Sequence, residues 1–280
     1  MSSFRTSSVF RFTKDYELLK KIIRDGIIPN YCEEDLSYGT FEFFVGIPMA
    51  SFCDIPITLL DEHTHRYGNY GIALSKEWAI ENSISPVMYI ANDAVLRSVQ
   101  FHYRRNQDFI NGFTQQIKEC KEKGIDPIMG ISRDDHVQAQ NSDQVHIANT
   151  HIIGYIKKYM GEYRSKPINN YEENEWRFLV PDIKGSEWFW SKEDYIKWRF
   201  PNNDWDAPKP SPSAEMKRWT LRFSSSDVSY ILLKDDEFKL KVIEYIKKLK
   251  TIGGNTITSE EQRDDMISKL ITLDQVKKDF

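Results

Sequence analysis

Residues 171–180 carry the charged side chains best placed for chemistry. Read as a strand, the alternation puts Trp176 and Phe178 on a buried face, and Glu175 and Arg177 together on the other. A carboxylate and a guanidinium two positions apart on one face can line a cleft. The same pattern also fits a salt bridge on a solvated strand face, and the residue types leave both interpretations open.

Arg11 is the second candidate, because it stands in the middle of an apolar strand expected at residues 8–13. It shares a face with Thr13, between Phe10 and Phe12 on the opposite face. An unpaired guanidinium is costly to bury, so Arg11 should meet a carboxylate, either Glu173 or Glu175, or an anionic ligand. Neither alternative is preferred by the pattern.

Two further segments place polar side chains where a site could form. Residues 67–71 combine Tyr67 and Tyr70 with two glycines; glycine admits a ligand to the backbone, and tyrosine offers a flat stacking face. Ser51 and Asp54 stand at the end of an apolar run. A turn with packed tyrosines would explain the first segment almost as well, and at the end of an element caps are commoner than sites.

A metal site is not predicted. His63 and His65 have a spacing that suits a strand, whereas their segment looks helical, so the two rings would diverge. Structural zinc sites have four ligands in paired spacing, which the chain lacks. The three cysteines form no CxxC pair, which is typical of free thiols in a reducing compartment.

The charge balance of the chain does not by itself predict that it binds nucleic acid. The chain of 280 residues has a formal net charge of −4, whereas proteins that grip a phosphate backbone usually show a basic excess. Two short basic clusters occur, at Arg104-Arg105 and at residues 239–250, and the second fits a solvated helix face. The chain shows no apolar signal-peptide core and no membrane-length apolar run, so we expect a cytoplasmic protein.

The pattern of elements predicts an α+β fold. Short strands lie among helices of varied length, and no nucleotide-binding glycine motif follows a strand. We expect one compact domain over residues 1–250, with residues 131–150 and 200–213 as loops. Residues 251–280 are expected to form a polar C-terminal tail.

Several motifs resemble the AbiGi-type abortive-infection proteins of bacterial phage defence. They cover the first 90 residues and extend to the strand with Glu175-Trp176-Arg177. The matching stretches are Phe10-Arg11-Phe12-Thr13, Leu18-Leu19, and residues 26–32, 47–56, 65–72 and 86–90. That family is described as the antitoxin half of a two-gene phage-resistance system, which implies a cognate partner protein.

A more distant resemblance is to ADP-ribosyltransferase-like proteins, including the DNA-modifying toxin group. It implies a split β core flanked by helices, with NAD bound as substrate and Glu175 as the catalytic carboxylate. Arg11, which replaces the commoner histidine, would anchor NAD with Thr13, and Tyr67 or Tyr70 would form the aromatic wall. The candidate substrate contacts are Ser51 and Asp54, because they end an apolar run, and Arg177, because it shares a strand face with Glu175.

Two functions from different classes follow. The chain is either an NAD-dependent ADP-ribosyltransferase-like effector that poisons the infected cell, or a non-catalytic antitoxin that binds a partner toxin directly. Nucleic acid would enter the first only as an acceptor. A phage-sensing module that binds through the aromatic-rich residues 188–205 is a third hypothesis.

Overall fold

The structure is a computed structural model whose contacts divide the chain into two compact units, where the sequence predicts one domain. The first unit contains Met1–Glu33, Gly46–Val87 and Met160–Phe280, and the second contains Glu34–Val45 and Met88–Tyr159. The structure describes residues 6–39, 42–59, 64, 66–163, 166–181, 190–205 and 207–279.

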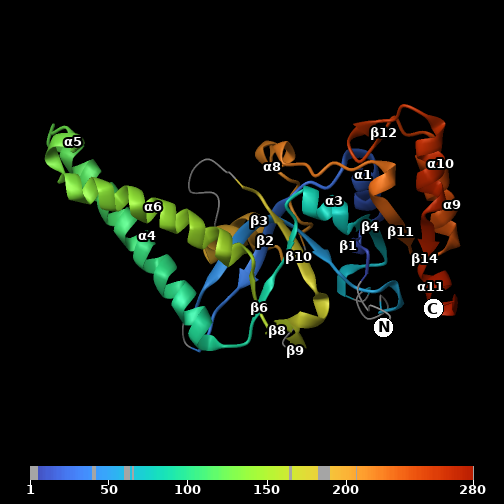
Figure 1. The fold of residues 1–280 in the computed structure, drawn as a ribbon, viewed down its shortest axis with the longest axis horizontal. Helices are drawn as coiled ribbons and strands as arrows, with labels where there is room; N and C mark the ends of the chain where they lie inside the picture. The colour runs from blue at the N-terminus through green and yellow to red at the C-terminus, as the bar shows by residue number, and fades with distance from the viewer. Residues whose placement is uncertain are drawn as a thin grey trace. The chain divides into compact units, whose positions relative to one another are not determined.

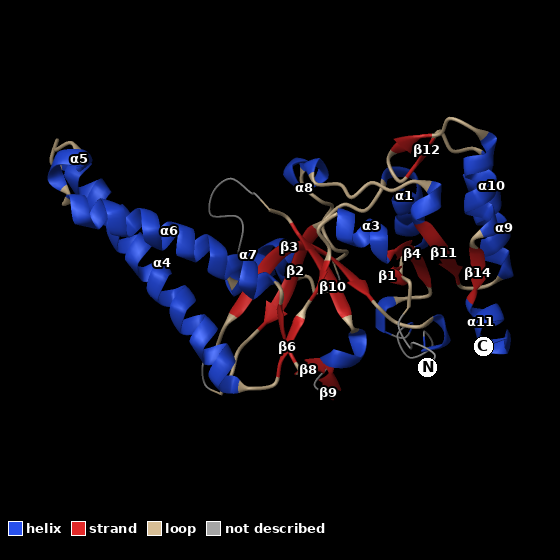
Figure 2. Cartoon of the chain, in the orientation of Figure 1, coloured by secondary structure: helices blue, strands red, loops and turns tan. Residues whose placement is uncertain are grey.

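A central mixed sheet, which lies mainly in the first unit, organises the fold (Figures 1 and 2). Its described strands are β1 (Ser8–Thr13), β2 (Asn30–Asp35), β3 (Phe44–Cys53), β4 (Tyr70–Ser75), β5 (Ser85–Pro86), β10 (Glu175–Leu179), β11 (Val228–Leu233) and β14 (Leu270–Thr272). Their order is β14-β11-β4-β1-β3-β10-β5, with β2 paired to β3. β11 and β14 are parallel, whereas β4, β1, β3, β10 and β5 pair antiparallel. The mixed sheet with its helices confirms the α+β class.

Helices cover both faces of this sheet. Asp15 begins α1 (Tyr16–Asp25) by accepting a hydrogen bond from the backbone N–H of Glu17, and Gly26 ends the helix. α1 packs against β1 and β4, and α3 (Lys76–Glu81) places Trp78 against Phe52. α11 (Leu273–Asp279) packs on the opposite face, in a cluster with Phe10.

The remaining elements of the first unit are shorter. The helices are α7 (Lys192–Arg199), α8 (Ala214–Arg218), α9 (Asp236–Lys247) and α10 (Glu260–Ser268), with 3₁₀ turns η1 (Ile57–Leu59), η2 (Asn170–Glu173), η3 (Pro201–Asn203) and η4 (Ser225–Asp227). Two small hairpins pair β8 (Met160–Tyr163) with β9 (Lys166–Asn169), and β12 (Thr251–Ile252) with β13 (Asn255–Thr256). In residues 200–213, the described part after η3 contains no helix or strand.

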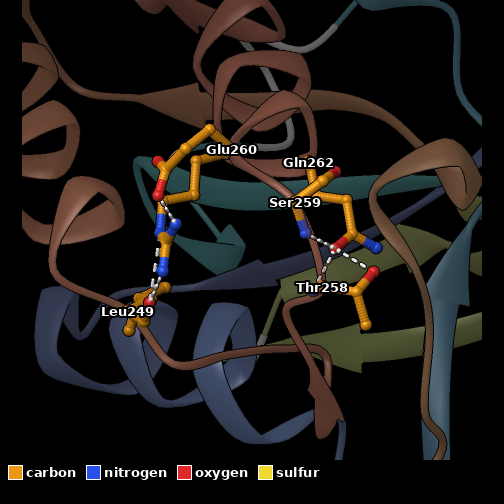
Figure 3. A network of polar contacts seen from close by, with 6 residues as sticks. Leu249, Thr258, Ser259, Glu260 and Gln262 are labelled. Carbon is orange, nitrogen blue, oxygen red and sulfur yellow. Dashed lines mark hydrogen bonds and ion pairs between the residues drawn. The ribbon is translucent and has the colours of Figure 1, made fainter.

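Residues 251–280 do not form the predicted tail, because β14 extends the central sheet beside β11. Leu273 and Val276 are buried in the same cluster as Phe10. Figure 3 shows how α10 begins: the Gln262 side chain accepts hydrogen bonds from the backbone N–H groups of Thr258 and Ser259. The few apolar residues of this segment are separated by charged ones, so composition alone suggested an exposed tail.

The second unit is dominated by a helical hairpin. α4 (Asp93–Glu122) and α6 (Arg133–Gly154) lie side by side, with α5 (Pro127–Gly130) at the turn between them (Figure 1). At the other end of the hairpin, β6 (Met88–Ile90) pairs in parallel with β7 (Ile156–Lys158). Among the helices that the structure describes, none has the length and apolar character to cross a membrane.

The predicted loop at residues 131–150 is wrong, because most of it belongs to α6. Ser132 caps this helix by accepting a hydrogen bond from the backbone N–H of Asp135. The helix packs chiefly on α4 and therefore buries only a narrow stripe that includes Ala139, Thr150 and Ile153. A stripe so narrow is hidden among the Asp, Gln and Asn residues around it.

Shortening Leu273 tests whether the C-terminal segment belongs to the core. We expect Leu273→Ala to lower the free energy of unfolding by about 2–5 kcal/mol, because the change opens a cavity beneath the sheet. The matched control is Leu240→Ala on the exposed side of α9, for which we expect a change within about 0.5 kcal/mol. Equal urea midpoints for the two variants would contradict this account.

Candidate functional site

The register of the sheet decides which predicted site residues share a face. Cys53 in β3 pairs with Phe10 in β1 and with Glu175 in β10, so these three side chains point to the same side. Arg11 follows Phe10 and therefore starts on the opposite side. The structure thus does not bring Arg11 and Glu175 together on one face of the sheet.

Arg11 is satisfied by a backbone carbonyl. Its Nη1 donates a hydrogen bond to the carbonyl oxygen of Ser51 at 2.8 Å, and its side chain is half-buried. Within the described residues no carboxylate lies within 4 Å of the guanidinium. The predicted substrate residue Ser51 therefore contributes its carbonyl oxygen to this contact.

Glu175 and Arg177 form a buried ion pair along one face of β10. Arg177 Nε donates to Glu175 Oε1 at 2.8 Å, and Nη2 donates to Oε2 at 3.1 Å. Both carboxylate oxygens are engaged, and the Arg177 side chain is completely buried. The salt bridge that the alternation allowed is therefore present, but inside the protein and not on a solvated face. Two parallel hydrogen bonds between a planar guanidinium and a carboxylate are strong and directional.

Tyr67 also has a partner within the chain. Its hydroxyl donates a hydrogen bond to Oε1 of Glu173, and Arg66 Nη1 lies 3.4 Å from the same oxygen. Glu173 is buried in η2, two residues before Glu175. The sequence placed Glu173 on the strand but held no signal for its pairing with Tyr67, because the two residues lie 106 positions apart.

Tyr70 belongs to an aromatic cluster. Its ring centroid lies 5.5 Å from that of Tyr16 and 5.2 Å from that of Phe238. Burial raises the pKa of the Tyr70 phenol above its usual value, and the charge of Asp235 adds to the effect. The interpretation as a packed tyrosine describes this contact set better than a stacking wall does.

Thr13 and Gly68 meet at a close crossing of backbones. Thr13 Oγ1 accepts a hydrogen bond from the backbone N–H of Asp15. Gly68 has φ of +112°, and a Cβ at this position would lie 2.2 Å from the Thr13 carbonyl oxygen. The space that this glycine leaves open is thus occupied by the chain itself.

Asp54 is held at the end of β3. One carboxylate oxygen accepts from the Thr6 hydroxyl, and the other lies 2.6 Å from Lys76 Nζ. No group of three or more metal-ligating side chains gathers in the described part of the chain, and His63 and His65 lie outside it. The catalytic, substrate-binding and NAD-binding roles of these residues stay predictions.

The second unit contains a surface that the sequence did not single out. Among the described residues of α5 and its flanks, three large apolar side chains face water: Ile125, Ile128 and Met129, here called the hairpin tip. Ile128 is 78% exposed and Met129 87%. The only signal in the sequence is an apolar stretch interrupted by Asp126-Pro127.

The hairpin tip is held in place by its own local core. The Asp126 side chain accepts a hydrogen bond from the backbone N–H of Ile128, which begins α5. A Cβ at Gly130 would lie 2.7 Å from Cys120 Sγ, so the turn packs directly on α4. A nitrogen of the His136 ring lies 3.2 Å from the Pro127 carbonyl oxygen. These local contacts therefore hold the backbone of the turn in a conformation that exposes Ile128 and Met129 to water.

The sides of the hairpin are apolar as well. α4 has 30 residues, yet only Leu96, Gln100 and Cys120 are buried among those described. Large apolar side chains are exposed on both helices: Val95, Phe101, Val137, Val145, Ile147 and Ile152. Two helices alone cannot cover all of these faces, so both helices of the hairpin leave large apolar side chains in contact with water.

Replacing one member of the buried ion pair tests whether it is structural. We expect Arg177→Met to lower the free energy of unfolding by about 3–5 kcal/mol, because the Glu175 carboxylate stays buried but loses the guanidinium group of Arg177. The double variant Glu175→Gln with Arg177→Met should lose less than the sum of the single changes. Urea unfolding of all three variants measures the coupling.

Arg218→Met is the control, because Arg218 pairs with Glu215 on the surface and should change stability by at most about 1 kcal/mol. The predicted catalytic role of Glu175 has a different expected result. If Glu175 is catalytic, Glu175→Gln should keep the wild-type unfolding midpoint but lose NAD binding and protection against phage.

Gly68→Ala tests the close crossing with Thr13. We expect a loss of more than about 1 kcal/mol, because the methyl group meets a backbone carbonyl and the residue needs positive φ. The control is Gly112→Ala in α4, where nothing lies within 4 Å and helix propensity should stabilise the protein by about 0.5–1 kcal/mol. Thermal unfolding of both variants should move the two melting temperatures in opposite directions.

Comparison with known proteins places the chain in a family. No solved structure matches it. An "Abortive phage resistance protein AbiGi" of Lactococcus lactis subsp. cremoris is 25% identical over 284 residues, covering 90% of this chain and 99% of that protein. The family model described as "Putative abortive phage resistance protein AbiGi, antitoxin" matches residues 25–234. The chain therefore belongs to the AbiGi family of abortive phage resistance proteins, as its motifs predict.

Proposed function

We propose that this chain is the antitoxin of an abortive-infection system and that it neutralises a partner toxin by binding it directly through the hairpin tip. The family description supports the role. The observation that carries the choice of surface is the exposure of Ile128 and Met129 on a locally fixed turn.

A protein partner is the occupant that such a surface fits. Covering a large apolar side chain is worth about 1.5–3 kcal/mol, and little ordering cost is paid when the turn is already fixed. Met129 adds a flexible, polarizable side chain that adapts to an apolar pocket. A small polar substrate such as NAD would gain nothing from these side chains.

The enzymatic hypothesis has less support. A shared NAD site needs Arg11 and Glu175 to act on one ligand, and the sheet register directs their side chains to opposite faces. Both oxygens of Glu175 are engaged by Arg177. In residues 188–205, Trp190 stacks on Tyr31 at 3.6 Å, so part of the aromatic surface expected for phage sensing packs within the protein.

The central test changes the hairpin tip to acidic residues. We expect the double variant Ile128→Asp with Met129→Asp to lose rescue of growth when co-expressed with the partner toxin, and to bind that toxin at least tenfold more weakly. The reason is that two carboxylates would have to be desolvated in an apolar contact. Expression of the wild-type chain alone should leave growth unaffected.

Leu240→Asp is the matched control, because Leu240 is 66% exposed in the first unit. It should rescue growth and bind toxin as the wild type does. Both variant proteins should melt at the wild-type temperature. Full rescue by the hairpin-tip variant would overturn the proposal, and growth arrest by the wild-type chain alone would favour the enzymatic hypothesis.

A further inference from the structure

A hollow of about 710 Å³ lies within the second unit, away from the residues that define the hairpin tip. It contains one of the two basic clusters that the sequence shows, Arg104-Arg105. The residues that line it are Tyr38, Arg97, Gln100, Phe101, Arg104, Arg105 and Asp108. A volume of this size is typical of sites for small molecules.

Three guanidinium groups line this hollow, and no described carboxylate pairs with them. Arg104 and Arg105 both lie about two turns after Arg97 along one side of α4, since positions i, i+7 and i+8 share a helix face. Within the described residues none of the three has a carboxylate within 4 Å, and Asp108 forms no ion pair with them. By contrast, Arg24, Arg66, Arg177, Arg218 and Arg263 each have a carboxylate partner.

Two of the three arginines are held by uncharged groups, so their positive charges are not neutralised by these contacts. Arg104 Nη2 donates to the carbonyl oxygen of Glu42 at 2.6 Å, and Arg97 lies over the Tyr38 ring at 5.6 Å. The buried Gln100 side chain donates to the Leu36 carbonyl oxygen at 2.7 Å, which ties α4 to the segment that carries Tyr38. Backbone carbonyls and rings position a guanidinium without neutralising it.

Phe101 supplies the other half of the lining. It is 58% exposed, although it lies one turn from Arg97 and Arg104 on α4. A phenyl ring open to solvent between guanidinium groups offers a face for a planar base. Aromatic rings beside positive charge are the common means of holding single-stranded nucleic acids.

We propose that this hollow binds a nucleotide unit, with the phosphate on Arg104 and Arg105 and the base on the Phe101 ring. The planar fork of arginine matches phosphate oxygens, and the absence of a carboxylate partner leaves both forks able to bind. An acidic protein segment would satisfy the arginines but would leave the ring unused. The attraction is local, because the whole chain carries a formal charge of −4.

The experiment measures binding of two probes to the full chain. A fluorescent single-stranded 12-mer, as RNA and as DNA, is followed by anisotropy, and a free mononucleotide is followed by equilibrium dialysis. Arg104→Gln with Arg105→Gln should weaken binding at least tenfold and reduce the slope against log salt by about 1.4, as expected for two lost phosphate contacts. Phe101→Leu should weaken binding severalfold and leave that slope unchanged.

Arg133→Gln is the control, because Arg133 is exposed on α6 outside the hollow, and it should bind as the wild type does. Binding of the mononucleotide supports a small-molecule nucleotide site, and binding of the 12-mer alone supports a nucleic-acid site. Failure of the wild type to bind either probe overturns the proposal, as does wild-type binding by the double arginine variant.

The two proposals for this chain fail separately. The hairpin-tip variant should bind both probes normally if the hollow acts independently of toxin binding. If the double arginine variant loses toxin binding and the wild type binds no nucleotide, the hollow receives an acidic protein surface and the nucleotide proposal is wrong.

Discussion

The pairing of Cys53 with both Phe10 and Glu175 determines the arrangement of the first unit. It sets one register across β1, β3 and β10, and the register decides which charged side chains can meet. Glu175 lies on the same face as Phe10, and its carboxylate binds the guanidinium group of Arg177, which belongs to the same strand. Arg11 is directed to the other face and is satisfied by the Ser51 carbonyl. The polar side chains conspicuous in the sequence thus have partners within the chain, and the ion pair between Glu175 and Arg177 is buried inside the protein.

Local patterns predicted the local structure well. The strand expected at residues 8–13 corresponds to β1, and the shared face of Glu175 and Arg177 is present. The relation of Arg11 to Glu175 could not be predicted, because a shift of one residue between paired strands reverses every face. Two other differences have a common cause. α6 and residues 251–280 bury few side chains per turn, so their apolar periodicity is too sparse to separate helix from loop.

In the second unit the candidate surfaces face water. Its hairpin exposes apolar side chains at the turn, and on α4 it carries guanidinium groups that have no carboxylate partner in the described part of the chain. Hydrogen bonds within the unit hold the turn and Arg104. A fixed apolar turn suits a protein partner, and a basic hollow beside a phenyl ring suits a nucleotide. These two surfaces use different residues and different physical interactions. The proposed toxin contact and the proposed nucleotide site therefore do not compete for the same residues.

Hydrogen–deuterium exchange of the full chain, with and without the proposed partner toxin, is the most direct test of whether that toxin binds at the hairpin tip. Toxin binding should slow exchange of the backbone amides in residues 123–131, because the partner would exclude water from the hairpin tip and suppress local opening. Exchange in the paired strands β1, β3 and β10 should remain as it is in the free chain. Unchanged exchange throughout residues 93–154, in a mixture in which the toxin is demonstrably neutralised, would contradict the account.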